Sequence, residues 1–168
     1  ALLGYVTDII HNVRNGHPRP LPKWVDYGDL IIRGAYVLLA WFIYNLPVLL
    51  IVLLLYTFSS AIGASLFGSL AYVMIAGCAL PLLFVYTVIA WSMLAVGMIH
   101  YSETGDNGVF YRFGKLFRVL QNNLSLTLQW VFYSIVSNIL FSLLIFIPCI
   151  GWIAVLALVY PVQGHLIG

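Results

Sequence analysis

Four runs of apolar residues dominate the pattern of the chain. They cover residues 35–58, 69–99, 126–147 and 150–167. None of them alternates apolar and polar positions as the strands of a membrane barrel do. In lipid only a helix or a closed barrel satisfies its own backbone, and about 20 helical residues cross the hydrocarbon core. The pattern therefore predicts an all-α, polytopic transmembrane protein with about four spans.

The spacing of the runs suggests how the spans are paired. The link between the last two runs, PCIG, is short, so these runs are predicted to form a helical hairpin and the first two runs another. The second run is longer than the bilayer requires and is expected to tilt or project. The fourth run is near the short limit, and partial insertion is the alternative to full spanning. We treat residues 1–168 as a single membrane domain.

Residues 1–15 and 107–122 have a different pattern, with apolar residues on one helical face and polar residues on the other. The apolar positions of the first segment are Leu2, Leu3, Val6, Ile9, Ile10 and Val13. Both segments are too polar to span, so we predict amphipathic helices that lie at the membrane interface. In the second segment Arg112, Lys115 and Arg118 share the polar face and are predicted to anchor it to an anionic leaflet. The alternative for this basic face is an acidic surface of a partner protein.

Residues 16–28 form a proline-rich elbow between the first amphipathic segment and the first span. Gly16 is expected to end the preceding helix. The three prolines from Pro18 to Pro22 cannot continue a helix and favour a stiff, extended connector. Trp24 is predicted to anchor the elbow at the interface, where its ring is half-buried and its N–H reaches water.

Composition agrees with this pattern, and the positions of the charges predict which parts of the chain lie on the cytoplasmic side. The 168 residues are 63% hydrophobic and 7% charged, whereas soluble domains carry about 25% charged residues. The seven basic and five acidic residues all precede the first span or lie between the second and the third. Basic residues in short loops mark the cytoplasmic side of a membrane. Both termini and the loop 100–125 are therefore predicted to be cytoplasmic.

Motifs for catalysis are missing from the sequence. We find no nucleophile–base pair, no CxxC, no HExxH and no phosphate-binding glycine loop, so the protein is predicted not to be an enzyme. Seven cations beside five acids do not indicate nucleic-acid binding. His100 and His165 end spans on the same side and could together bind a metal or a tetrapyrrole. The interpretation we favour is that both are interfacial residues, so no metal and no cofactor is predicted, and lipid or pigment contacts stay open.

Ser134, Asn138 and Ser142 follow one another at four-residue spacing in the third run, which places them on one helical face. In lipid such a stripe usually holds helices together through hydrogen bonds, and a polar pathway is the alternative. Asn138 is expected to matter most, because an unpaired side-chain amide in hydrocarbon is costly. The stripe therefore predicts a helix-packing face.

Several short motifs resemble one known family. They are GYVTDIIHNVRNG, PLPKW, DYGDLIIRG, NLP and IPCIGW. Together they resemble a prokaryotic family of small polytopic membrane proteins that is known as a domain of unknown function. Lys23 stands where an acid is expected in that family. The resemblance implies a small multi-span fold in the cell (inner or plasma) membrane of a prokaryote and brings no catalytic residue.

Two functions of different classes fit these features. The first is a non-catalytic structural or accessory subunit that packs against other membrane proteins, with a bioenergetic or photosynthetic complex as a candidate host. The alternative is a small transporter or channel that acts as an oligomer. An ion-coupled transporter usually needs an ionisable group within the membrane, and the only one in the runs is His165, near the end of the last. The accessory role is therefore favoured.

The one-sided charges generate a topology prediction. Cysteines introduced at Ser60 and at Gly105 should react with an impermeant thiol reagent from opposite sides of the membrane, because a single crossing separates the two links. Labelling of both positions from the same side would overturn the arrangement.

Overall fold

The computed structural model describes residues 1–22, 26–62, 66–144 and 150–168. Within these ranges the chain forms six α-helices and one short 3-10 helix. They are α1 (Leu2–Arg14), α2 (Tyr27–Ile62), α3 (Leu66–Thr104), η1 (Asn107–Tyr111), α4 (Phe113–Asn122), α5 (Leu124–Leu144) and α6 (Ile150–Ile167). In the described part three segments are long and apolar enough to cross a membrane: Tyr27–Ser60, Gly68–Thr104 and Leu124–Leu144. The prediction of an all-α chain with several membrane-spanning helices is confirmed.

Two compact units make up the chain, residues 1–40 together with 92–168, and residues 41–91. The smaller unit holds adjoining stretches of α2 and α3. Within it the Tyr86 hydroxyl donates to the carbonyl oxygen of Tyr44 at 2.9 Å. Most of its large apolar side chains are exposed, and Phe84 reaches 65%. Such exposure is expected for surfaces whose solvent is lipid.

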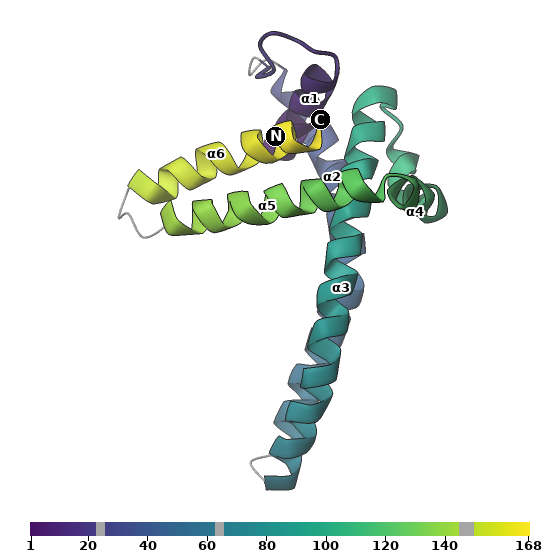
Figure 1. Ribbon diagram of the computed structural model, residues 1–168, viewed down its shortest axis with the longest axis vertical. Helices are drawn as coiled ribbons and strands as arrows, with labels where there is room; N and C mark the ends of the chain where they lie inside the picture. Colours follow the sequence, from purple (N-terminus) through teal and green to yellow (C-terminus); the bar gives the residue numbers. More distant parts are fainter. Residues whose placement is uncertain (23–25, 63–65, 145–149) are drawn as a thin grey trace. The chain divides into compact units, whose positions relative to one another are not determined.

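The larger unit is organised around α1. Ile9 and Ile10 are almost fully buried, and Tyr5, Ile9 and Leu30 form an apolar cluster against which Val13 packs. Helix α1 packs against α6, and α6 runs alongside α5 (Figure 1). The apolar face of α1, which we expected to enter the headgroup region, is therefore covered by protein. An amphipathic pattern calls for an apolar neighbour, and here α2 and α6 supply it.

Glycines let α1 approach its neighbours closely. A Cβ added at Gly4 would overlap the carbonyl oxygen of Leu30 in α2. A Cβ at Gly34 would come within 3.0 Å of the Gly4 nitrogen, and one at Gly164 of α6 within 3.1 Å of the Ile9 Cγ2 atom. Membrane helices use such small residues to bring two backbones together. The position of α1 is thus set by close contact on two sides.

Gly16 ends α1, as predicted. It has a φ of +66°, which glycine adopts without strain. Its N–H donates to the Val13 carbonyl at 3.0 Å, and the N–H of His17 donates to the Asn12 carbonyl at 3.0 Å. These two bonds are the Schellman pattern, which satisfies the last carbonyls of a helix. The Asn12 side chain also donates to the Pro20 carbonyl at 3.1 Å, so the proline segment is tied back to the end of α1.

Helix α2 begins at Tyr27, well before the apolar run that starts at residue 35. Asp29 lies in its first turn, where a negative charge complements the helix dipole. Leu30 and Val37 are 4% and 1% exposed and pack within the larger unit. The sequence pattern missed these first turns because Asp29 and Arg33 interrupt the apolar run, and only one face of them, with Leu30 and Gly34, is buried.

The predicted single helix over 107–122 is wrong, because the chain forms η1 and α4 with a break at Arg112. The Asp106 carboxylate accepts from the Gly108 N–H at 2.9 Å and pairs with Arg112 at 3.2 Å. Phe110 is fully buried, and its ring lies 5.3 Å from the ring of Tyr101 in α3. Local capping by Asp106 and burial of Phe110 therefore fix a tight turn that an uninterrupted helix could not make.

The structure also improves the topology experiment. Gly105 has a φ of +67°, which a cysteine adopts only with strain. Gln121 is exposed on α4, so it is the better site for the cysteine on the charged side.

Replacing Gly4 by alanine should loosen α1. The added methyl group overlaps the Leu30 carbonyl oxygen, so the helix must move, and we expect a loss of about 1–3 kcal/mol in unfolding free energy. Thermal unfolding in detergent and the rate of trypsin cleavage after Arg14 would measure it. Gly28→Ala is the matched control, because a Cβ there meets nothing within 4 Å. Equal behaviour of the two variants would show that the close crossing is not important.

Candidate functional site

The larger unit contains a cavity of about 580 Å³. Its walls come from the end of α1, the last turns of α3, the junction of α4 and α5, and the end of α6. The cavity is lined by Arg14, Ser92, Ala95, Val96, Ile99, His100, Val119, Asn123, Leu126, Thr127, Gln129, Trp130, Tyr133, Leu166, Ile167 and Gly168. Its volume lies in the range of about 300–1,000 Å³ that is usual for small-molecule sites. The lining combines apolar side chains with a few polar groups, as such sites do.

Arg14 and His100 are the side chains in this lining that carry a charge or can gain one. Arg14 lies in the last turn of α1, and its Nε is 2.7 Å from the Glu103 carboxylate near the end of α3. His100 precedes Glu103 by one helical turn, and its Nδ1 lies 4.0 Å from the same carboxylate. All three side chains are partly exposed to solvent. Glu103 therefore orients Arg14 at the rim without removing it from the cavity.

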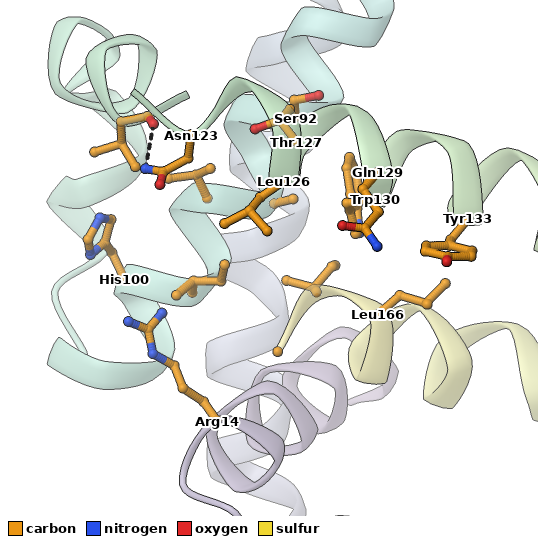
Figure 2. Close-up of a pocket in the computed structure, with 16 residues that line it drawn as sticks. Arg14, Ser92, His100, Asn123, Leu126, Thr127, Gln129, Trp130, Tyr133 and Leu166 are labelled. Atoms are coloured by element: carbon orange, nitrogen blue, oxygen red, sulfur yellow. Dashed lines mark hydrogen bonds between the residues drawn. The ribbon is translucent and has the colours of Figure 1, made fainter. Parts of the chain in front are cut away.

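Asn123 makes the turn that joins α4 to α5. Its backbone is non-helical, and its N–H donates to the carbonyls of Val119 and Leu120 at 3.1 and 3.3 Å. Its side-chain amide also donates to the Val119 carbonyl at 3.0 Å (Figure 2). The turn satisfies the open end of α4 and redirects the chain. It places the first turns of α5, including Trp130, along one wall of the cavity.

Trp130 contributes a buried polar atom that the chain does not satisfy. Its Nε1 is inaccessible to solvent and has no hydrogen-bond acceptor among the residues that the structure describes. An unpaired buried donor costs about 1–3 kcal/mol. Trp130 also lines the cavity, but it does so with other atoms, because Nε1 itself exposes no surface.

A second, more polar cavity of about 560 Å³ lies beside α1 in the same unit, lined by residues of α1, α2 and the end of α3. Here Arg33 Nη1 donates to the Asp8 carboxylate at 2.7 Å. Burial raises the pKa of Asp8 above its ordinary value, and the nearby Arg33 guanidinium acts in the opposite direction. The ion pair therefore offsets only part of the lost hydration of the carboxylate.

Helices α5 and α6 are joined by side-chain hydrogen bonds. Ser134 Oγ donates to Gln163 Oε1 at 3.3 Å, and Gln163 Nε2 donates to Ser137 Oγ at 3.1 Å. Ser134 is buried in α5. Sequence reasoning missed Gln163, because a glutamine near the end of an apolar run gives no sign of its partner. The contact is of the kind that holds helices together in lipid.

One comparison assigns the chain to a family. The model of the family described as "Protein of unknown function (DUF4013)" matches residues 1–162. The chain belongs to the DUF4013 family. The resemblance seen in the PLPKW and DYGDLIIRG motifs is thereby confirmed, and the family description assigns no activity. No curated protein and no solved structure matches the chain.

The structure separates the two histidines that the sequence of this DUF4013 protein suggested as a pair. His100 lines the cavity, whereas His165 is exposed on α6 and is not part of the lining. Within the described ranges no group of three or more His, Cys, Asp or Glu side chains is placed to hold a metal ion.

The polar stripe of α5 is also divided. Ser134 reaches Gln163, but Asn138 Nδ2 donates to the Ser134 carbonyl at 2.8 Å and Ser142 Oγ to the Ile139 carbonyl at 2.7 Å. Asn138 and Ser142 thus bond within their own helix, and both are exposed. The described contact between the helices runs through Ser134 and Ser137.

Three of the four predicted interface anchors fall in the described part of this DUF4013 chain. Arg112 pairs with Asp106 at 3.2 Å, and Lys115 and Arg118 are exposed on α4. Trp24 lies outside the described residues. On α4, Leu116 is buried, while Phe113 and Phe117 of the same apolar face are 46% and 41% exposed.

Replacing Gln163 by leucine should weaken the pairing of α5 with α6. The variant leaves Ser134 and Ser137 without their shared partner, so we expect a loss of about 1 kcal/mol, the scale of an intramembrane hydrogen bond. Thermal or denaturant unfolding in detergent would measure the loss. Ser142→Ala is the control, because its hydroxyl bonds to its own helix. A Gln163→Leu protein as stable as the control would contradict this role.

Proposed function

We propose that this DUF4013 protein is a non-catalytic integral membrane protein that acts as an accessory subunit and packs against other membrane proteins. A bioenergetic or photosynthetic complex is one class of host. The observation that carries the proposal is the uncovered face of α5, where an exposed asparagine lies among exposed large apolar side chains.

Helix α5 buries little of its surface within its own chain. Only 6% of its most apolar window is buried. Leu128, Phe132 and Leu140 are 59%, 62% and 58% exposed. Lipid can cover such a face, but so can another membrane helix, and bulky aromatic and leucine side chains provide a large contact area for it.

Asn138 favours a protein neighbour over lipid. A carboxamide offers two donor hydrogens and an acceptor oxygen, and the bond to the Ser134 carbonyl uses one of the donors. The residue lies in the apolar helix α5 and is exposed. Leaving an amide in hydrocarbon is costly, whereas a polar group on a neighbouring helix would satisfy it. This supports an interface between subunits at this face.

The proposed topology has four spans in two hairpins, α2 with α3 and α5 with α6, in the plasma membrane of a prokaryote, with both termini cytoplasmic. One ion pair supports it, because Arg14 meets Glu103. Arg14 precedes the first span and Glu103 follows the second, and an even number of crossings between them places both on the same side. This agrees with the one-sided distribution of charge.

Site-specific photo-crosslinking would test the accessory role. A photoreactive phenylalanine analogue at Ile139, which is 55% exposed, should form a discrete adduct with a larger membrane protein in intact cells. The same analogue at Phe110, which is fully buried, is the control and should give no such adduct. Asn138→Leu should reduce stoichiometric co-purification about fivefold, since one intramembrane hydrogen bond contributes about 1 kcal/mol.

Two results would contradict the proposal. Adducts to lipid alone would show that the face has no protein neighbour. Adducts only to a second copy of the chain, together with solute flux in proteoliposomes that Asn138→Leu abolishes without disturbing assembly, would favour the alternative of a small oligomeric transporter or channel.

A further inference from the structure

The 580 Å³ cavity of the larger unit is amphipathic along its length. In Figure 2, Asn123, His100 and Arg14 lie toward one end, while Trp130, Tyr133 and Leu166 lie toward the other. The rest of the lining is mainly apolar, with residues such as Val96, Ile99 and Leu126. A ligand that fits this arrangement has a polar head and an apolar tail.

The polar end lies at the boundary between an apolar helix and the charged loop that follows it. His100 belongs to the last turns of α3, where the apolar run stops and the charged loop begins. Arg14 reaches the same place from α1. Lipid headgroups occupy this level of a bilayer. A head bound at Arg14 would therefore keep its natural depth while its tail follows the first turns of α5.

The available donors suit a phosphate. A guanidinium carries five N–H donors, so Arg14 can hold the Glu103 carboxylate and a phosphate oxygen together. Arginine binds phosphate well because its planar fork matches the spacing of two oxygens. The imidazole of His100 and the amide of Asn123 lie at the same end of the cavity (Figure 2).

We propose that this cavity binds one anionic phospholipid, with its phosphate at Arg14, His100 and Asn123. The proposal needs only that the chain is embedded in a membrane, and it stands whether or not the chain is an accessory subunit. Free inorganic phosphate shares the head chemistry, so the experiment separates the two sources.

Native mass spectrometry of the delipidated full chain in detergent would test it, with phosphatidylglycerol, phosphatidylcholine and inorganic phosphate as the three probes. We expect one phosphatidylglycerol per chain, weaker retention of phosphatidylcholine, and no displacement by millimolar phosphate. Arg14→Gln should lower the affinity for phosphatidylglycerol by about tenfold or more, the scale of one charge-assisted hydrogen bond.

One further variant separates recognition from general charge. Arg118→Gln removes an exposed cation of α4 outside the cavity and should change nothing. Equal retention of both lipids, displacement by phosphate, or a loss in Arg118→Gln matching that in Arg14→Gln would each overturn the proposal.

Discussion

The close backbone crossing of α1 with α2 is the contact on which the larger unit depends. Gly4 and Gly34 permit it, and a side chain at Gly4 would strike the Leu30 carbonyl. Because the two backbones touch, the apolar face of α1 reaches Leu30 on one helix and α6 on the other. The last turn of α1 then carries Arg14 to the end of α3. The cavity has its polar rim because α1 is held at this place.

The ion pairs of α1 depend on this packing and do not replace it. Arg14–Glu103 and Asp8–Arg33 both involve partly exposed side chains, and such pairs usually contribute about 0–1 kcal/mol. Burial of the apolar face stabilises α1 more, since one fully buried aliphatic side chain contributes about 1.5–3 kcal/mol, and Ile9 and Ile10 are both almost fully buried. The pairs instead select the rotation of α1 and keep Arg14 at the rim.

Periodicity and charge predicted the helical class, the positions of the long helices and the glycine stop at Gly16, because each of these is decided by local chemistry. What they could not decide is which surface covers a given face. The pattern of residues 1–15 fits lipid and protein equally, and Gln163 is one polar residue whose partners lie 26 and 29 positions away. The local sequence did indicate the break at Arg112, because Asp106 stands two residues before Gly108 and can cap a short helix there. The prediction of one helix followed the spacing of the apolar residues and did not use this indication.

The polar groups of so apolar a chain can be sorted by whether the chain satisfies them. Ser134, Ser137 and Gln163 bond to one another and therefore belong to the internal structure. Asn138 lies on an exposed face and uses one of its two amide hydrogens in a bond within its own helix. Trp130 Nε1 is buried without an acceptor in the described part. An exposed amide in hydrocarbon has no water to bond with, so Asn138 persists at a cost unless a neighbouring molecule pairs with it. The accessory role follows from this residue, whereas the lipid site follows from the charged rim that Arg14 and His100 give the cavity.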